Sequence, residues 1–232
     1  GFPLSTGESR EMCSYACRDA DIALVEGGRG LYEGAEALTD VGSTAAIAKE
    51  LDLPVILVVS AQSITRSAAA LVKGFQAFDP EVRIVGVILN NVKGGTHKAK
   101  AVAAIEHYCG VPVIGAIPRM DQMQLTMRHL GLVPYREGAG KGDFDTRIRT
   151  ITEMIEQYVD LDRLLLLMKE STVPAQAYPS FEKTVHPDVT IGVAFDEAFN
   201  FYYADLFDVL ASLGAKTIMF SPVHDRLPEA DG

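Results

Sequence analysis

The feature of this sequence with the clearest chemical potential is a glutamate followed by a run of glycines. The segment reads Glu26-Gly-Gly-Arg-Gly-Leu-Tyr-Glu-Gly34 and follows a short apolar run at 22–25. That run is uninterrupted by polar residues, which predicts a buried strand. Ligands in open α/β sheets bind outside the carboxyl ends of the strands, so Glu26 would stand at a ligand-bearing edge. An ordinary strand followed by a flexible turn, with Glu26 merely solvated, would give the same pattern.

The elements that would position this segment alternate between strand and helix. Strands are predicted at 55–59, 84–89 and 113–117, as continuous apolar runs of the kind found in parallel sheets. The predicted helices are 8–19, a helix from Ser43 or Thr44 that ends at Leu53-Pro54, 62–78 and 96–108. This alternation predicts an α/β fold with a parallel, doubly wound sheet.

The character of the sequence changes after residue 136. A glycine-rich stretch at 137–143 predicts a hinge, and 144–170 predicts one long amphipathic helix. Residues 171–188 contain three prolines and predict a linker. A strand at 189–195, a helix at 198–213 and a strand at 217–220 predict the beginning of a second α/β unit. We therefore expect a first domain at 1–136, a connecting region at 137–188 and a truncated second domain at 189–232.

Composition limits the classes of function. The 232 residues carry a net charge of -10, which disfavours a nucleic-acid partner, and no apolar run approaches the ~18 residues of a membrane span. The three cysteines, Cys13, Cys17 and Cys109, are too sparse for a disulfide framework or a metal cluster. They predict buried or partly buried thiols in a reducing, cytoplasmic compartment. An unfinished sheet with exposed edges also predicts that the chain associates with itself, with a homodimer as the expected form.

Several motifs carry a family resemblance that extends over essentially the whole chain. The motifs are Glu26 to Gly34, Gly42-Ser-Thr44, Arg66-Ser-Ala-Ala-Ala-Leu71, Gly86-Val-Ile-Leu-Asn90, Gly115-Ala-Ile-Pro-Arg119 and Arg128-His-Leu-Gly-Leu-Val-Pro134. With them the chain resembles the cobyrinate a,c-diamide synthase family. It is most similar to the methanogen branch, the Ni-sirohydrochlorin a,c-diamide synthases of coenzyme F430 biosynthesis. The resemblance implies a P-loop NTPase-like sheet similar to dethiobiotin synthetase, followed by a class I glutaminase-like domain.

The activity that this resemblance implies is a carbon–nitrogen ligase reaction that uses ATP, Mg2+ and glutamine. ATP would phosphorylate acetate side chains a and c of a tetrapyrrole, and ammonia from glutamine would displace the phosphate to leave an amide. An acyl phosphate is a far better acyl donor than a carboxylate, and Mg2+ spreads the phosphate charge. Ni-sirohydrochlorin is the expected substrate, and cobyrinate, the substrate in cobalamin biosynthesis, is the alternative.

The resemblance also assigns roles to individual residues. It implies that Glu26 is catalytic and holds Mg2+, and that Glu33 is catalytic although the cobyrinate branch usually has aspartate there. The implied adenine-binding residues are Asn90, Pro118 and Arg119, and the implied substrate-binding residues are Arg29, Tyr32, Ser43, Thr44 and Arg66. A plain helix cap accounts equally well for Ser43 and Thr44. Arg29 stands where the cobyrinate branch more often has an apolar residue, so it would add a cation for a carboxylate-rich substrate.

Two parts of the family pattern do not occur in this sequence. The phosphate-binding loop of the form G-x-x-x-x-G-K-[ST] is absent, and so are the glutaminase nucleophile and its partners. The stretch from Phe195 to Tyr202 resembles only the opening of the glutaminase domain. We therefore expect a fragment of a longer chain that is inactive alone.

Two classes of protein other than a biosynthetic ligase also fit the sequence. A regulatory ATPase of the partitioning type has a related sheet, but it would favour a basic or amphipathic surface for DNA or membrane, which the net charge of -10 does not suggest. A non-catalytic binding module, acting with a partner that supplies the phosphate loop, is the other alternative.

Overall fold

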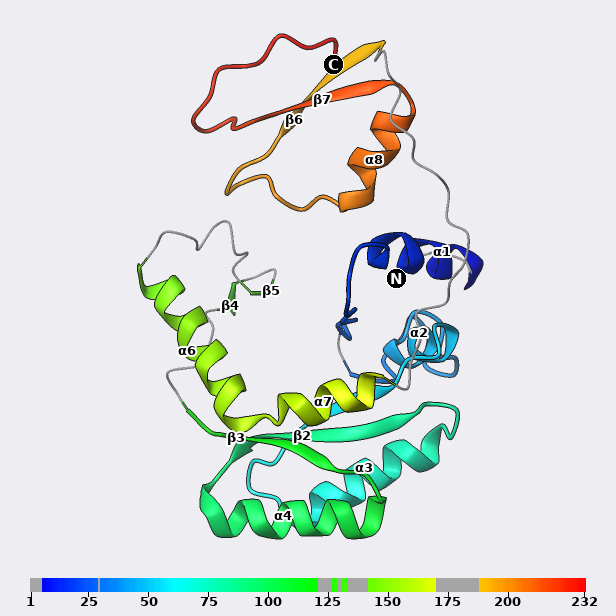
Figure 1. The fold of residues 1–232 in the computed structure, drawn as a ribbon, viewed down its shortest axis with the longest axis vertical. Coiled ribbons are helices and arrows are strands. Elements are labelled where there is room, and N and C mark those ends of the chain that lie inside the picture. Colours follow the sequence, from blue (N-terminus) through cyan, green and yellow to red (C-terminus); the bar gives the residue numbers. More distant parts are fainter. Residues whose placement is uncertain (1–5, 29, 121–126, 129–130, 133–141, 170–187) are drawn as a thin grey trace. The chain divides into compact units, whose positions relative to one another are not determined.

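The computed structural model describes residues 6–28, 30–120, 127–128, 131–132, 142–169 and 188–232. The chain divides into two compact units, which are described separately below (Figure 1). The first unit comprises 1–122 and 150–178, and the second comprises 123–149 and 179–232.

The first unit is built on a three-stranded parallel sheet in the order β1-β2-β3. These strands are β1 (Val55–Ser60), β2 (Ile84–Val92) and β3 (Val113–Pro118). Ser60 pairs with Asn90, and Val92 pairs with Pro118, so the carboxyl ends of all three strands meet at one edge. The predicted parallel strands are confirmed, and β2 extends three residues beyond its predicted end.

Two helices cover one face of this sheet and form the main core with it. They are α3 (Arg66–Phe78) and α4 (Gly94–Cys109), and between them and the strands lie the fully buried side chains of Val72, Val87, Leu89 and Ile105. Gly110 ends α4 with a φ of 68°, as a helix C-terminal glycine does.

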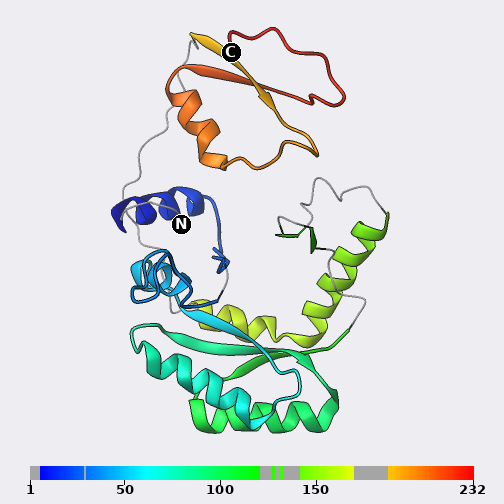
Figure 2. The ribbon, with the colours of Figure 1, turned by 180° about the vertical axis from the view of Figure 1, so that it is seen from behind.

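The opposite face of the sheet is covered by α7 (Leu161–Met168), so helices lie on both faces (Figure 2). The single helix predicted at 144–170 is wrong, because α6 (Gly142–Tyr158) and α7 are separated by a contact with the sheet. Val159 forms a β-bridge with Gly115, and the amide of Asp160 donates to the Ile114 carbonyl at 2.7 Å. The Asp160 carboxylate then accepts from the Arg163 amide at 2.9 Å, which begins the new helix.

Two short helices lie at the N-terminal end of the first unit. They are α1 (Thr6–Cys17) and α2 (Thr44–Glu50), and the Arg10 guanidinium joins them by donating to the Glu50 carbonyl at 2.8 Å. Cys13 and Cys17 on α1 are half-buried free thiols, and Cys109 on α4 is buried, which confirms the prediction for the cysteines. Burial raises the pKa of Cys13 to about 11, with the nearby Cys17 adding to the effect.

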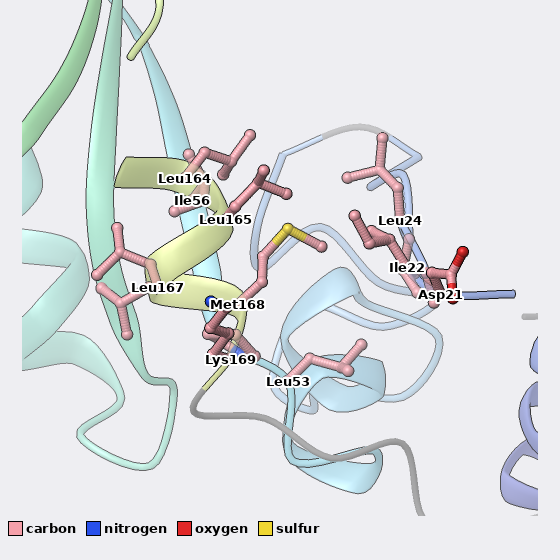
Figure 3. Close-up of a pocket in the computed structure, with 14 residues that line it drawn as sticks. Asp21, Ile22, Leu24, Leu53, Ile56, Leu164, Leu165, Leu167, Met168 and Lys169 are labelled. Atoms are coloured by element: carbon pink, nitrogen blue, oxygen red, sulfur yellow. The ribbon is translucent and has the colours of Figure 1, made fainter. Parts of the chain in front are cut away.

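The buried strand predicted at 22–25 is wrong. None of the described strands pairs with this run, and Leu24 is 89% exposed. A strand persists only where its backbone N–H and C=O groups find a neighbour, and β1 pairs only with β2 among the described residues. The run instead lines an apolar groove of about 440 Å³, across which Ile22 and Leu24 face side chains of α7 such as Met168 (Figure 3).

The second unit contains two small sheets. β4 (Met127–Arg128) pairs antiparallel with β5 (Gly131–Leu132). β6 (Val189–Ala194), α8 (Ala204–Ser212) and β7 (Ala215–Phe220) form a parallel strand–helix–strand unit, as predicted. Among the described residues of the whole chain, no helix combines the length and apolar character that crossing a membrane requires.

The helix of this second unit begins at Ala204 rather than at the predicted residue 198, because Asp196 organises a turn there. One oxygen of its buried carboxylate accepts from the amides of Ala198 at 2.8 Å and Phe199 at 3.0 Å. The other accepts from the Ser221 hydroxyl at 2.7 Å. The hydrogen bond from Ser221 is the main cause that holds the pKa of Asp196 below its usual range, and the backbone amides add to this effect. Asp196 therefore links the carboxyl ends of β6 and β7.

Candidate functional site

A cleft of about 430 Å³ lies at the carboxyl edge of the three-stranded sheet. It is formed by the residues that follow β1, by the junction of β2 and α4, and by the end of β3. The lining residues are Gln62, Ser63, Asn91, Val92, Lys93, Gly94, Pro118 and Arg119. This is the edge at which parallel α/β sheets bind their ligands.

The backbone around this cleft adopts an unusual conformation. Ser63 and Asn91 have φ values of 61° and 59°, in the left-handed region that side chains other than glycine rarely adopt, and Gly94 has a φ of 72°. Each such non-glycine residue costs about 1–3 kcal/mol, and these conformations concentrate at functional sites. Asn91 is stabilised by a 3.3 Å hydrogen bond from its side-chain amide to the Ser60 hydroxyl. The strain supports the view that the cleft is shaped for a ligand.

The three residues predicted to bind adenine gather at this edge. Pro118 and Arg119 both line the cleft, and the Arg119 amide donates to the Val92 carbonyl at 3.2 Å. Asn90 lies at the neighbouring strand end, but its side-chain oxygen accepts from the Asn91 amide at 2.8 Å. Asn91, rather than Asn90, contributes to the cleft lining. Adenine binding by these residues stays a prediction.

Sequence reasoning missed Gln62, Ser63 and Lys93, although a signal for them was present. Gln62 and Ser63 come shortly after β1, and Lys93 directly follows β2, so the rule that ligands bind at the carboxyl ends of the strands could have found them. α3 and α4 both begin beside the cleft, and the partial positive charge of helix N-termini adds to the charges of Lys93 and Arg119. The cleft is therefore suited to an electron-rich or anionic ligand.

The glycine segment with the two predicted catalytic glutamates is anchored on α2. The Ala45 amide donates to the Leu31 carbonyl at 2.9 Å, and the Thr44 hydroxyl donates to the Gly30 carbonyl at 3.4 Å. Glu26 and Glu33 are both exposed, and the Glu33 carboxylate lies against Gly30, where a Cβ would collide with it. Neither glutamate lines the 430 Å³ cleft.

These two carboxylates form no complete metal site by themselves. In the part of the chain that the structure describes, His, Cys, Asp and Glu side chains do not gather in groups of three or more that could hold a metal. A magnesium ion commonly takes one or two protein carboxylates and fills its remaining positions with phosphate oxygens and water. Exposed Glu26, on a segment that brings no other ligand cluster, fits that kind of partial donor set.

The predicted substrate-binding residues do not form one cluster. Ser43 is fully buried, and its hydroxyl accepts from the Ala46 amide at 3.0 Å, so it is the N-cap of α2 as the sequence allowed. Tyr32 packs on α3, where its hydroxyl donates to the Phe75 carbonyl at 2.9 Å. Arg66 is exposed in the first turn of α3, and Arg29 lies outside the described residues. Substrate binding by these residues, and by Thr44, stays a prediction.

Comparison with known proteins shows two kinds of similarity. The family model described as an AAA domain matches residues 6–126. Over its whole length the chain is 50% identical to the cobyrinate a,c-diamide synthase of Methanosarcina acetivorans and 44% identical to that of Methanobrevibacter smithii. It is also 44% identical, over 91% of its length, to the protein of that name in Salmonella typhimurium. No solved structure matches the chain.

The chain spans about half the length of the curated relatives that it matches. It covers 49% of the Methanosarcina acetivorans protein, 51% of the Methanobrevibacter smithii protein and 46% of the Salmonella typhimurium protein. The relatives therefore contain as much sequence outside the matched region as within it.

Proposed function

Since this chain belongs to the AAA domain family and is homologous throughout to cobyrinate a,c-diamide synthases, we propose that it is the central part of an ATP- and glutamine-dependent ligase. The ligase converts acetate side chains a and c of a tetrapyrrole into amides. The names of the relatives support the reaction and the class of substrate. The cleft at the sheet edge is the structural observation that supports nucleotide binding.

The adenine base of ATP is the ligand we assign to that cleft. Asn91 offers an amide at the cleft, and an amide can both donate to and accept from the edge of a base. Pro118 presents an apolar surface on the other side, and Arg119 and Lys93 supply positive charge. Asn90 would act indirectly. Its side-chain oxygen accepts a hydrogen bond from the backbone amide of Asn91 and so helps to position that residue. The phosphates would extend toward residues that lie outside this sequence, since the sequence has no phosphate-binding loop.

Glu26 would hold the Mg2+ that accompanies ATP, and Glu33 would assist it or orient the substrate. When bound, Mg2+ spreads the negative charge of the phosphates and of the group being transferred. Exposed carboxylates on a segment fixed to α2 suit this task, because no atom lies within 4 Å of the Cβ position of Gly28 and the phosphates could approach the backbone there. Gly27 instead leaves room for the Thr44 side chain, since a Cβ at Gly27 would stand 3.0 Å from it.

Two tetrapyrroles are candidates for the substrate. Cobyrinate is supported by the names of the relatives. Ni-sirohydrochlorin, the precursor in coenzyme F430 biosynthesis, is supported by Arg29, which adds a cation to the glycine segment where a carboxylate-rich ring would need one. Arg66, which is exposed in the first turn of α3, is a second cation available to substrate carboxylates.

The second unit would begin the glutaminase-like domain that supplies ammonia. Its parallel β6–α8–β7 unit is consistent with the opening of an α/β domain. The free thiols at Cys13, Cys17 and Cys109 support a reducing, cytoplasmic location, and exposed apolar residues beside β1 support a homodimer. We propose no nucleic acid and no membrane as partners, in line with the net charge of -10.

The decisive experiment assays the full-length protein with Mg-ATP, glutamine and each tetrapyrrole, and counts the amides formed by mass spectrometry. Two amides on one of the two substrates would support the proposal and identify the substrate. Amide formation on neither would contradict it.

The variant Arg29→Met tests the choice of substrate: the KM for Ni-sirohydrochlorin should rise at least several-fold while the KM for ATP stays constant. Equal changes in both would remove the support that Arg29 gives to Ni-sirohydrochlorin.

A further inference from the structure

The side chain of His97 joins two segments that form the walls of the 430 Å³ cleft. On one side, Nδ1 of His97 accepts a 2.9 Å hydrogen bond from the Lys93 amide, at the junction of β2 and α4. On the other side, Nε2 of His97 lies 2.6 Å from the Ile64 carbonyl oxygen, one residue after Ser63. His97 itself does not line the cleft and is half-buried in the first turns of α4.

These two partners fix the tautomer of the imidazole. A backbone amide can only donate, so Nδ1 of His97 must carry a lone pair. A carbonyl oxygen can only accept, so Nε2 must carry the proton. The neutral ring with its proton on Nε2 satisfies both bonds at once.

The turn after β1, which His97 contacts at Ile64, packs the side chains of Ala61 and Ile64 against the core. Among the described residues, this turn forms backbone hydrogen bonds from the Ala61 amide to the Asn90 carbonyl at 2.7 Å and from the Ile64 amide to the Ala61 carbonyl at 3.2 Å. Only the first of these two reaches the neighbouring strand. Ser63 lies between them with its left-handed φ of 61°, a conformation that its surroundings must maintain. The bond from His97 to Ile64 is therefore well placed to hold Ser63 in position.

We propose that His97 is a positioning residue that sets the distance between the Gln62-Ser63 wall and the Lys93 wall of the cleft, and thereby its affinity for an adenine base. Without the imidazole, the Lys93 amide and the Ile64 carbonyl lose this partner, and the separation of the two walls beyond the strand ends is less constrained. The adenine part of this inference rests on the proposed function. The clamping part rests only on the two hydrogen bonds and on the backbone conformations that they join.

Three substitutions separate the two bonds. His97→Asn places an acceptor near the position of Nδ1 and keeps the Lys93 bond, whereas His97→Gln places a donor near Nε2 and keeps the Ile64 bond. His97→Phe keeps the ring but removes both. His107→Phe, on an exposed histidine of the same helix, is the matched control. Unchanged amide protection in β2 and β3 would show that each variant remains folded.

The first measurement is amide hydrogen exchange of the 232-residue chain without ligand. In His97→Phe the exchange of residues 61–65 and of the Lys93 amide should accelerate about tenfold, while His107→Phe should match the wild type. His97→Asn should accelerate 61–65 and spare Lys93, and His97→Gln should do the reverse. Exchange in His97→Phe equal to the wild type, with β2 and β3 intact, would overturn the proposal.

The second measurement is the affinity of the full-length protein for ATP, by isothermal titration calorimetry. His97→Phe should weaken binding about tenfold, and His97→Asn and His97→Gln about threefold each, since a single hydrogen bond contributes a factor of about two to ten. Affinity unchanged in His97→Phe, beside a wild type that binds ATP, would overturn the adenine part. A wild type that binds no adenine nucleotide would overturn the proposed function, and the exchange experiment would still decide the clamping part.

Discussion

The ammonium group of Lys49 lies 2.7 Å from a carboxylate oxygen of Asp79, which connects the last turn of α2 to the residue that ends α3. The same ammonium lies 2.7 Å from Asp40. The hydrogen bond from Lys49 is the main cause that holds the pKa of Asp79 below its usual range, while burial opposes it. The hydrogen bond to Asp40 is the main cause that raises the pKa of Lys49, and the hydrogen bond to Asp79 is the second. This three-residue network therefore joins α2 and the loop before it, which follows the glycine segment, to the end of α3.

The network predicts a loss of stability in acid. Because folding lowers the pKa of Asp79, its contribution is present above the unfolded pKa of about 4 and is lost as the pH falls through the folded pKa. Lys49→Met should lower the free energy of unfolding by about 1 kcal/mol at pH 7 and by less at pH 2, as urea titrations would measure. Lys98→Met, on an exposed lysine of α4, is the control. Equal losses for Lys49→Met at both pH values would contradict the ion-pair explanation.

Gly115, on the sheet face that meets α7, is predicted to be required for close packing. A Cβ at Gly115 would lie 3.0 Å from Val159 and 3.3 Å from Ile88, which is tighter than carbon atoms normally approach. Gly115→Ala should therefore destabilise the first unit by about 1–3 kcal/mol through overpacking. Val159→Ala in the same chain should recover part of the loss, and a double-mutant cycle in urea would measure the coupling. Additive effects of the two substitutions would contradict the packing explanation.

The same contact explains why the sequence predicted the elements of the sheet but not the break between α6 and α7. Strands β1, β2 and β3 follow from continuous apolar runs, whose burial on both faces is a local property of the sequence. The break at Val159 depends on Gly115, a residue more than forty positions earlier. No periodicity within 144–170 contains that information, so an uninterrupted helix was the natural expectation.

The prediction of a strand at 22–25 was wrong for a similar reason. Its composition is that of a strand, but a strand also requires a hydrogen-bonding neighbour, and none of the described strands supplies one. At the cleft, the family resemblance selected Pro118 and Arg119 together with Asn90, and the strands that carry them, β3 and β2, are indeed neighbours. It could not show that Asn90 turns its oxygen to the Asn91 amide, because the left-handed φ of Asn91 is not readable from residue type.

The exposed apolar groove is predicted to make the isolated chain associate. Leu24 is 89% exposed and Ile22 is 54% exposed, both line the groove, and contiguous apolar surface of this kind promotes association. Leu24→Lys combined with Ile22→Lys should reduce self-association and the binding of an apolar dye, as light scattering and fluorescence would show. Leu213→Lys, at an exposed leucine of the second unit, is the control. Unchanged association in the double variant would exclude this surface as the cause.

Tyr32 provides a test that separates a structural role from substrate binding. Its ring packs with centroids 5.7 Å from Phe75 and 4.7 Å from Phe78, and its hydroxyl donates to the Phe75 carbonyl. Tyr32→Phe should therefore cost about 1 kcal/mol of unfolding free energy, whereas the substrate KM of the full-length protein should rise only if the hydroxyl also contacts the substrate. Tyr108→Phe, on an exposed tyrosine, should change neither. A raised KM with unchanged stability would instead establish substrate contact by the Tyr32 hydroxyl.

The role of Glu26 can be tested with and without the rest of the protein. The 232-residue chain alone should neither hydrolyse glutamine nor turn over ATP, because its sequence contains no phosphate-binding loop and no glutaminase nucleophile.

In the full-length protein, Glu26→Gln removes the charge that would hold Mg2+ and should lower amide formation at least about a hundredfold. Effects of this size are seen when a single electrostatic contact is removed from an active site. Glu36→Gln is the matched control, since Glu36 is an exposed carboxylate two residues after the glycine segment, and its oxygen accepts from the Thr39 hydroxyl at 3.1 Å. Equal losses in the two variants would show that Glu26 has no special part in the reaction, and ATP hydrolysis by the isolated chain that disappears in Glu26→Gln would show that the phosphate-binding loop is not required.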